Sequence, residues 1–396
     1  MSDGPYAFVY EPALTDWQLA PDHPFKPERL ALLRDLLRET RILPADEVRA
    51  PEPLQPSELL RVHDADYVAM VERVSRGERP VDALRYGLGT SDTPVTDGLH
   101  EAVARVCAAT ATAVRLVADG EVRRAASFAG GLHHAMPGRA SGFCVYDDLA
   151  VGILRAVDRG LRVAYLDLDA HHGDGVQEVF YASDQVLTIS VHESGRYLFP
   201  GTGHTHEVGT GPGRGWSVNL PLEPFTEDDA YLTAFDAVVP RALEAFRPDL
   251  IVLQAGADPH RDDPLAHLAL SLTGLRALYD RVVALADAHA DGRLVVTGGG
   301  GYAAYDVVPR AWAQAWSAMT GRPVPERLPD PWRERWRRRL GVRLPTSALD
   351  EADLRPQPRR RSIESHNRAV AQRLLQVLEE IWAAGAPTAH AKEEPT

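Results

Sequence analysis

The stretch RVAYLDLDAHHGDGVQEVF, residues 162–180, has the pattern of a strand that turns into a helix. Its first half carries Val163, Tyr165 and Leu166, the β-branched, aromatic and apolar residues typical of a buried strand in a parallel sheet. Ionisable residues follow directly: Asp167, Asp169, His171, His172 and Asp174. Because open α/β sheets bind ligands at the carboxyl ends of their strands, the stretch predicts an α/β fold with a functional site at that edge.

The ionisable residues of this stretch indicate a metal site. Carboxylates and imidazoles this close repel one another, or shift their pKa values, unless a cation neutralises them. Asp169 and His171 are separated by one residue, so on an extended segment both side chains point the same way and can hold one ion. Mixed oxygen and nitrogen ligands suit zinc or iron(II). A strand end with solvated polar residues is the alternative, and similar chemistry at other strand ends argues against it.

A second predicted strand, at residues 125–128, leads into the loop GGLHHA with the adjacent His133 and His134. The two glycines before the histidines allow the backbone to approach a neighbouring element closely. A single histidine here would more often be a surface or capping residue. A pair after a strand is a candidate for acid–base catalysis.

Two further predicted strands lead to candidate site residues. Asp258 lies four residues past the strand at 250–254, where a third metal ligand would be needed, although an aspartate in a surface turn is the alternative. The strand at 294–297 is followed by GGGG and Tyr302. Each glycine costs conformational entropy on folding, so this backbone is expected to pass close to another group. The alternation of strands and helices predicts a parallel, doubly wound sheet with these residues at one edge.

Composition limits the classes of protein that the chain can belong to. The 396 residues are 44% hydrophobic and 25% charged, which is enough for one large core. The net charge of −13 argues against nucleic acid as a partner, because phosphate binding needs a basic face. Cys107 and Cys144 make no disulfide framework and fit a reducing compartment. The N-terminus has no signal-peptide pattern and no run of about 18 apolar residues occurs, so we expect a cytoplasmic protein without a membrane partner.

Three regions are expected along the chain. Residues 1–325 form a single α/β domain, with a central and mainly parallel sheet flanked by helices. Residues 326–384 follow as a basic segment and a C-terminal helix packed on that domain, and residues 385–396 as a disordered tail. The patterns predict helices from about position 27 and over 62–73, 97–119, 226–246 and 364–384, further strands at 8–10 and 186–192, and a long surface loop at 76–93.

Eight motifs occur in order along the chain: DHPFKPERL, SDTPVTDG, GGLHHA, SGFCVYDD, YLDLDAHHGDG, FPGTG, LQAGAD and GGGGY. Together they resemble the zinc-dependent histone deacetylase family, over roughly residues 8–320. The segments HESGRYLFPGTG and ADPHRDDPLAHL are most similar to the bacterial acetoin-utilisation branch, the deacetylases that act on acetyl-coenzyme A synthetase. The resemblance implies the arginase/deacetylase fold with a C-terminal helical extension, and hydrolysis of N6-acetyl-lysine in proteins with release of acetate.

The resemblance also implies roles for individual residues. The zinc ligands would be Asp169, His171 and Asp258, with iron(II) as an alternative ion in the cell. The catalytic residues would be His133, His134, Tyr302, Asp167 and Asp174, with the two aspartates orienting the two histidines. Substrate would be bound by Asp92 at the rim, by Phe143 and Phe199 as channel walls, and by Gly142 and Gly300. Structural potassium would be bound by Asp167, Asp169, His171, Ser190 and Val191, and a second ion by carbonyls of Phe180, Ser183, Val186 and Trp216.

The implied reaction is metal-assisted amide hydrolysis. The ion and Tyr302 would polarise the acetyl carbonyl, His134 would take a proton from the attacking water and return it to the lysine amine, and His133 would stay protonated. The spacing does not decide which histidine does which.

Two alternative functions stay open. A deacetylase of small acetylated amines such as acetylpolyamines is disfavoured by GGLHHAMPG, because the polyamine branch usually has a proline and a glycine before its histidine pair. An inactive acetyl-lysine-binding module is disfavoured because Tyr302 and all three ligands are present.

Three positions qualify the resemblance. Asp92 precedes Pro94, where the sequence predicts a helix start, so an N-terminal cap is the alternative role for this aspartate. Pro264 stands where nuclear members have the arginine that binds inositol phosphate, and Pro259 alters the loop after the third ligand. Regulation by nuclear corepressors is therefore not expected, and the sequence leaves the oligomeric state open.

Overall fold

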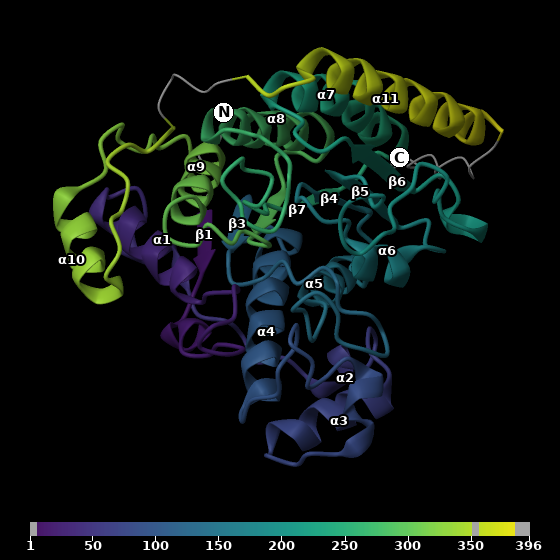
Figure 1. Ribbon diagram of the computed structural model, residues 1–396. Coiled ribbons are helices and arrows are strands. Elements are labelled where there is room, and N and C mark those ends of the chain that lie inside the picture. Colours follow the sequence, from purple (N-terminus) through teal and green to yellow (C-terminus); the bar gives the residue numbers. More distant parts are fainter. Residues whose placement is uncertain (1–5, 351–355, 385–396) are drawn as a thin grey trace, which may run out of the picture.

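The computed structural model describes residues 6–350 and 356–384, and Figure 1 shows its elements. One sheet runs in the strand order β2-β1-β3-β8-β7-β4-β5-β6, and each neighbouring pair is parallel. The predicted α/β fold with a central parallel sheet is confirmed. The strands are β1 Tyr6–Val9, β2 Val48–Arg49, β3 Arg124–Ser127, β4 Val163–Asp167, β5 Val186–Glu193, β6 Ser217–Leu222, β7 Leu250–Gln254 and β8 Leu294–Thr297.

Helices cover both faces of the sheet. Helices α7, α8 and α9 pack in series above it in Figure 1, and α4 and α5 pack on each other below it. The α-helices are α1 Glu28–Glu39, α2 Pro56–Leu59, α3 Ala65–Ser75, α4 Leu99–Ala118, α5 Asp148–Val157, α6 Asp174–Phe180, α7 Asp228–Phe246, α8 Leu272–His289, α9 Val308–Thr320, α10 Asp330–Leu340 and α11 Arg360–Ala383.

Strand β4 lies inside the sheet between β5 and β7, and all five of its residues are buried. This is the expected environment of a parallel strand covered by helices on both faces. The register places Asp167, the last residue of β4, opposite Ser190 of β5 and Gln254 of β7. Gln254 lies opposite Thr297, the last residue of β8. Because the strands are parallel, the loops that follow β4, β7 and β8 open at the same edge.

Some elements are not indicated by the sequence pattern. Strand β6 contains Pro221, which removes a backbone donor, but β6 is an edge strand with one unpaired side where no donor is needed. Strand β2 has only two residues, which is too short to produce a periodic pattern. The loop predicted at residues 76–93 contains a short 3-10 helix, Val81–Tyr86.

The prediction that a helix starts at Pro94 is wrong. Helix α4 begins at Leu99, after Gly98 with a φ of 78°, which agrees with the helix predicted over 97–119 and not with a start at Pro94. Leu99 is fully buried, so the start of the helix is set by the apolar face that packs in the core rather than by the proline. Asp92 consequently lies in an irregular loop and does not cap this helix.

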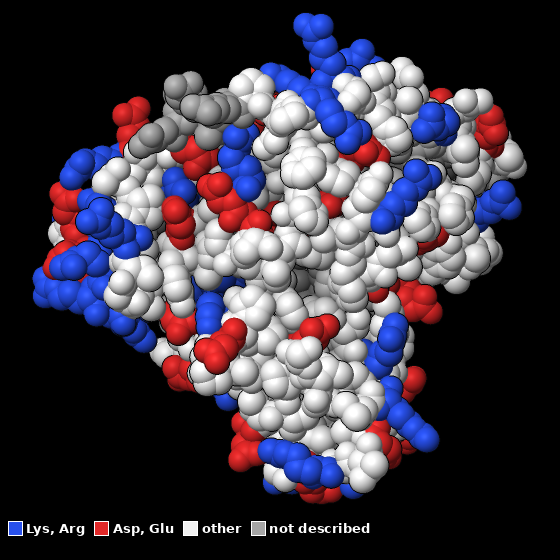
Figure 2. All heavy atoms as spheres, in the orientation of Figure 1, with Lys and Arg blue, Asp and Glu red and all other residues white. Residues whose placement is uncertain are grey.

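Residues 326–350 and 356–384 are here called the C-terminal extension. Its helix α10 packs against α1, where Trp332 Nε1 donates to the carbonyl of Leu32 at 3.1 Å. Helix α11 packs on α7 and β6, and begins at Arg360, earlier than predicted. Arginines of α10 form the blue group at the left of Figure 2. The tail predicted at 385–396 lies outside the described residues.

A helix that crosses a bilayer must be long and predominantly apolar. Among residues 6–350 and 356–384, every helix is either too short or too polar to cross a membrane.

Candidate metal centre and active site

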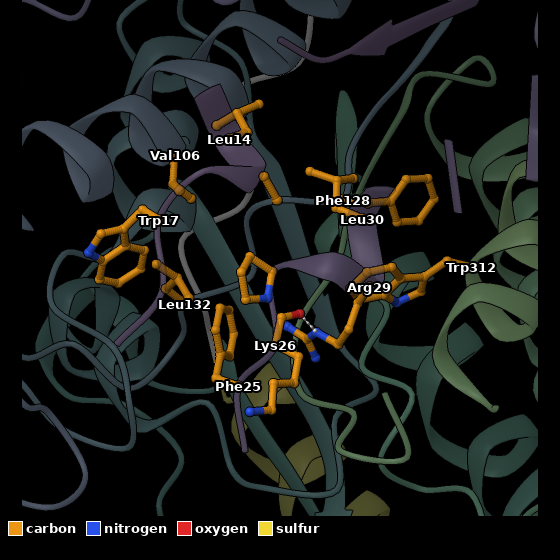
Figure 3. A pocket seen from close by; sticks show the side chains of 12 residues that line it. Leu14, Trp17, Phe25, Lys26, Arg29, Leu30, Val106, Phe128, Leu132 and Trp312 are labelled. Carbon is orange, nitrogen blue, oxygen red and sulfur yellow. Dashed lines mark hydrogen bonds between the residues drawn. The ribbon is translucent and has the colours of Figure 1, made fainter. Parts of the chain in front are cut away.

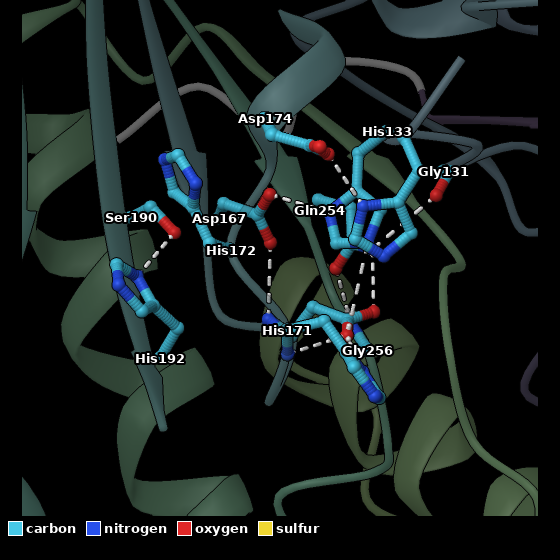
Figure 4. Close-up of polar contacts among 12 residues, drawn as sticks. Gly131, His133, Asp167, His171, His172, Asp174, Ser190, His192, Gln254 and Gly256 are labelled. Carbon is cyan, nitrogen blue, oxygen red and sulfur yellow. Dashed lines mark hydrogen bonds and ion pairs between the residues drawn. The ribbon is translucent and has the colours of Figure 1, made fainter. Parts of the chain in front are cut away.

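The side chains of Asp169, His171 and Asp258 meet at the carboxyl edge of the sheet, and Figure 4 shows His171 there among polar neighbours that include Asp167 and Gln254. Each offers one ligand atom, and these atoms lie within 4.8 Å of one another. The Nδ1 atom of His171 lies 3.0 Å from Asp169 Oδ1 and 3.0 Å from Asp258 Oδ2. All three residues are buried. The structure thus brings together the three predicted ligands from two different loops.

These three atoms fit a divalent metal ion. Ligands bound at about 2.0–2.2 Å from a tetrahedral zinc lie roughly 3.3–3.6 Å apart, close to the 3.0 Å distances of this site. Burial, together with the charge of Asp169, raises the pKa of Asp258. A cation between the carboxylates would remove the cost of burying two like charges. Three protein ligands would also leave a position open toward the pocket, as in catalytic sites.

Asp169 is held from behind by backbone and side-chain donors. Its Oδ2 accepts hydrogen bonds from Gln254 Nε2 and from the Gly300 N–H, both at 2.7 Å. Its Oδ1 accepts the N–H of His171 at 3.0 Å. A Cβ at Gly300 would lie 2.0 Å from Asp258 Oδ2, so only glycine allows the backbone to pass here. Gly300 therefore lies directly behind the metal ligands.

His133 is paired with a buried carboxylate. Its Nδ1 lies 2.7 Å from Asp167 Oδ2, which also accepts the hydroxyl of Tyr165 at 2.6 Å. Burial by itself would lower the pKa of His133, but the charges of Asp167 and Asp169 raise it to about 9. The surroundings of His133 therefore favour the protonated ring.

His134 is also paired with a carboxylate, but its pKa is lowered rather than raised. Its Nδ1 lies 2.7 Å from Asp174 Oδ1, and its ring centroid lies 4.0 Å from that of His133. Burial lowers the pKa of His134, and the charge of His133 lowers it further against the effect of Asp174. Two adjacent histidines with opposite protonation preferences can serve as one base and one electrostatic stabiliser.

A pocket of about 240 Å³ leads to this centre. Within the described residues, Tyr302 makes its hydrogen bond through its backbone N–H, which leaves its hydroxyl without a protein partner. Burial raises the pKa of Tyr302, and the charges of Asp258 and Asp169 raise it further, so the hydroxyl keeps its proton. The pocket is lined by Asp92, His134, Gly142, Phe143, His171, Leu198, Phe199, Leu265 and Tyr302.

Four predicted substrate residues, Asp92, Gly142, Phe143 and Phe199, line this pocket, whereas Gly300 lies behind the metal ligands and is not among the lining residues. Gly142 has a φ of 50°, and a Cβ there would lie 2.4 Å from His134 Cδ2. Phe143 has a φ of 70°, a left-handed conformation that is uncommon for an aromatic residue, and its ring meets Tyr302 edge-on at 5.7 Å. The ring of Phe199 meets His134 edge-on at 5.0 Å, and Asp92 is exposed.

The residues predicted to bind potassium lie at opposite ends of strand β5. Ser190 and Val191 lie toward its carboxyl end, where Ser190 is paired in register with Asp167. The carbonyl of Val191 accepts the hydroxyl of Tyr231 at 3.0 Å. The second set lies at the amino end: Val186 begins β5, Phe180 and Ser183 precede it in the turn, and the carbonyl of Trp216 accepts the N–H of Thr188.

Two residues around the ligands escaped the sequence analysis. Gln254 donates to Asp169, and a polar residue ending the otherwise apolar strand LIVLQ is the signal that could have revealed it. Asp263 is buried, and its Oδ2 accepts the N–H of Tyr302 at 2.7 Å. In the sequence, the adjacent Asp262 and Asp263 look like the polar residues of a solvent-exposed turn. In the structure Asp263 links the Asp258 loop to Tyr302.

His23 is a third residue that the sequence did not single out. Its Nδ1 accepts the N–H of Phe25 at 3.1 Å, so its Nε2 carries the proton and donates to the carbonyl of Asp92 at 3.2 Å. Its ring meets Phe143 edge-on at 4.5 Å. His23 therefore stabilises both the rim loop and one channel wall.

A second pocket lies beside the glycine run that precedes Tyr302. Figure 3 shows Arg29 among its lining residues, which include Phe25, Leu132 and Trp312. Arg29 is buried, and its Nη1 donates to the carbonyls of Gly299 at 3.2 Å and Gly301 at 2.7 Å. A buried cation thus stabilises the backbone that presents Tyr302.

Comparisons with known proteins agree with the geometry. The model of the family described as "Histone deacetylase domain" matches residues 23–319. The acetoin utilization protein AcuC of Bacillus subtilis (strain 168) is 41% identical over 371 residues, covering 93% of this chain and 96% of the relative. AcuC of Staphylococcus xylosus is 37% identical over 372 residues, covering 93% and 97%. The crystal structure of an HDAC homolog complexed with SAHA matches with a TM-score of 0.83 at 30% identity, covering 93% of this chain and all of the other.

Proposed function

Because the chain belongs to the histone deacetylase family, we propose that it removes the acetyl group from N6-acetyl-lysine side chains of proteins and releases acetate. Deacetylase chemistry follows from the family, and the protein-bound lysine substrate is the proposal. The observation that carries it is the meeting of an Asp-His-Asp ligand set, two His–Asp pairs and Tyr302 at one pocket.

The metal proposed for this site is zinc, with iron(II) as the alternative in the cell. Asp169, His171 and Asp258 supply the mixed oxygen and nitrogen donors that both ions accept. A divalent ion held there supplies Lewis-acid chemistry, which polarises a carbonyl and makes a water more acidic. Potassium, held through Asp167, Ser190 and their neighbours, is proposed as a structural ion only.

The side chains around the metal site divide the remaining work. His134, with its lowered pKa, accepts a proton from the attacking water and later gives it to the leaving lysine amine. His133 keeps its proton and stabilises negative charge beside it. The hydroxyl of Tyr302 donates to the acetyl oxygen as that oxygen gains charge. Asp167 and Asp174 fix the orientation of the two rings through their Nδ1 atoms.

The shape of the pocket supports a lysine side chain as substrate. Phe143 and Phe199 give apolar walls that suit the methylene stem of acetyl-lysine. Asp92, exposed at the rim, can accept hydrogen bonds from backbone N–H groups beside that lysine. Acetyl-coenzyme A synthetase is a protein substrate suggested by the similarity to the acetoin-utilisation proteins. Neither nucleic acid nor a membrane is proposed as a partner.

The substrate class is tested by comparing an acetyl-lysine peptide with N-acetylputrescine, which has no peptide backbone. Asp92→Ala is expected to lower kcat/KM on the peptide by roughly ten- to a hundredfold, the effect of a lost charge-assisted hydrogen bond. The same variant should leave turnover of N-acetylputrescine unchanged.

Asp97→Ala is the matched control for this test, since Asp97 is an exposed carboxylate of the same loop whose ion pair with Arg79 lies outside the pocket. This variant should resemble the wild type on both substrates. Equal losses of Asp92→Ala on peptide and amine, or preference of the wild type for N-acetylputrescine, would show a small-molecule deacetylase instead.

A further inference from the structure

We propose that Asp350, in the C-terminal extension, is a positioning residue for the metal centre and for Tyr302. It would act through residues 257–263, here called the ligand loop. The inference rests on the proposed function, because it assigns Asp258 as a ligand. Asp350 lies beyond residues 23–319, the part of the chain that the family model matches.

The ligand loop carries two groups that the site needs. Asp258 supplies one of the three ligand atoms, and Asp263 accepts the N–H of Tyr302 at 2.7 Å. The loop is also tied to the glycine run, because the N–H of Ala257 donates to the carbonyl of Gly300 at 2.8 Å. A shift of this loop would therefore move a metal ligand and the tyrosine together.

His260 lies between these two aspartates and points to the extension. Its ring is fully buried, and its Nδ1 accepts the N–H of Asp262 at 3.2 Å. The proton of the neutral ring must then be on Nε2. That Nε2 lies 2.9 Å from Asp350 Oδ2, so His260 donates to the carboxylate. The ligand loop is thus bound to the extension by a buried, charge-assisted hydrogen bond.

Asp350 is itself fixed by other elements. Its Oδ2 also accepts the N–H of Leu272, the first residue of α8, at 2.7 Å. Its Oδ1 lies 3.4 Å from Nη1 of Arg310, on α9. Arg310 in turn pairs with Asp306 at 2.8 Å. Because α8 and α9 both pack in the main domain, Asp350 holds the loop to a rigid frame rather than to a mobile arm.

Loss of a group that is hydrogen-bonded directly to a metal ligand typically costs 10- to 100-fold in metal affinity or activity. Asp350 acts one contact further out, through His260 in the loop that carries Asp258, so an effect at the lower end of this range is expected. Removing Asp350 leaves the buried Nε2–H of His260 without its acceptor. The ligand loop would then sample positions in which Asp258 and Tyr302 no longer meet at the pocket. A residue that only fastens the extension would lower stability and leave these two properties intact.

The test uses the full-length protein with three single substitutions. Asp350→Ala removes both acceptor oxygens, and Asp350→Asn keeps one neutral acceptor oxygen for His260 and Leu272. Glu47→Ala is the matched control, because Glu47 is also a carboxylate paired with an arginine, Arg322, at 2.5 Å. Glu47 directly precedes β2, at the edge of the sheet, and among the described residues it makes no contact with the ligand loop.

Zinc affinity is measured by competition with a chromophoric chelator, and kcat and KM are measured separately on an acetyl-lysine peptide. Asp350→Ala should weaken zinc binding about tenfold or more and lower kcat by a similar factor, with KM within about twofold of the wild type. Asp350→Asn should fall between Asp350→Ala and the wild type, and Glu47→Ala should bind zinc as tightly as the wild type.

The proposal is overturned if Asp350→Ala, or Asp350→Asn should the alanine variant not fold, keeps wild-type zinc affinity and kcat. Zinc affinity is measured without substrate, so the two proposals can fail separately. If the wild type turns over no acetyl-lysine peptide but Asp350→Ala still binds zinc more weakly than the wild type, the proposed reaction is rejected and the positioning role of Asp350 is retained.

Discussion

The two halves of the metal centre are held by different parts of the fold. On one side, Asp169 and His171 directly follow β4, a buried strand between two others, and Asp169 accepts hydrogen bonds from Gln254 and Gly300. On the other side, Asp258 lies in the long connection between β7 and α8, and its Oδ1 accepts the N–H of Ala170 at 2.8 Å. We call these the sheet side and the loop side.

The difference shows how a precise site can include a long loop. On the sheet side, Asp169 and His171 closely follow β4, and the hydrogen bonds of this strand with its neighbours fix their position. On the loop side, Asp258 follows β7 by four residues, but its loop continues as a long connection to α8. This connection depends on further contacts: with Ala170, with Gly300, and with Asp350 through His260. Substitutions on the two sides should therefore differ in what they cost.

Removing one ligand from each side should give the largest effect and the sharpest contrast. Asp169→Ala and Asp258→Ala should each lose bound zinc and deacetylase activity, because two ligands hold the ion far less well than three. Asp169→Ala should lower the free energy of unfolding more than Asp258→Ala, which leaves one buried donor, the N–H of Ala170, without an acceptor. Asp169→Ala leaves the buried donors of Gln254 and Gly300 without an acceptor, at about 1–3 kcal/mol each.

Metal content and urea unfolding of the two purified variants measure this contrast. If Asp258→Ala keeps full metal content and turnover, Asp258 is not a ligand. If both variants lose the same unfolding free energy, the distinction between the two sides is wrong.

Tyr302→Phe tests a group that the loop side presents to the pocket. The variant should fold and bind zinc normally, because the ring packing on Phe143 is retained. Turnover of the peptide should fall by about 100-fold or more, as when one donor to a developing oxyanion is removed. An unchanged kcat would remove the Tyr302 hydroxyl from the mechanism.

Asp263→Asn should have a smaller effect on the same side. The carboxylate accepts the N–H of Tyr302 through one oxygen and the N–H of Leu265 through the other. An asparagine can accept only one of them, so kcat should fall by about tenfold, the lower end of the range for such supporting contacts. Asp262→Asn is the control, since that side chain is 67% exposed. Wild-type kcat in Asp263→Asn would show that Tyr302 needs no such support.

His63 lies on neither side of the metal centre, and it should make the free energy of unfolding depend on pH. It lies between Met136 and Asp147, with its Nδ1 3.1 Å from the Met136 carbonyl and its Nε2 accepting the Asp147 N–H at 3.0 Å. Burial lowers the pKa of His63 to about 4. The unfolded chain, with a pKa of about 6.5, then binds more protons, so stability falls as the pH drops from about 6.5 toward 4.

This histidine alone should cost about 1 kcal/mol of unfolding free energy between pH 7.5 and 5.5. Urea unfolding of the wild type and of His63→Gln at the two pH values measures this contribution. The glutamine side chain cannot be protonated, so the unfolding free energy of His63→Gln should fall by about 1 kcal/mol less than that of the wild type. The same slope in both proteins would show that folding does not lower the pKa of His63.

Much of the sheet side could be predicted from the sequence, because strand periodicity and the spacing of Asp169 and His171 are local properties. Asp258 could be predicted from its place after an apolar strand. The histidine pair and Tyr302 can be predicted because glycine runs indicate close backbone approach, and the structure shows that approach at Gly300.

The supporting residues could not be predicted in this way. His260 and Asp350 are 90 positions apart, and nothing in either neighbourhood marks the other as a partner. Gln254, Asp263 and His23 act through contacts with other loops, which only the folded chain brings together. The pattern over 97–119 predicts α4 to within two residues, but the start that Pro94 suggests is wrong, because burial of Leu99, a tertiary effect, outweighs the local preference of proline.

The account depends most directly on the link between the buried Asp-His-Asp centre and amide hydrolysis. The decisive measurement is acetate release from an acetyl-lysine peptide by protein that is stripped with a chelator and then reloaded stepwise with zinc. We predict no turnover in the stripped protein, a rise in proportion to added zinc, and saturation at about one ion per chain. Full turnover in the stripped protein, or tight binding of one zinc ion without any acetate release, would contradict the account.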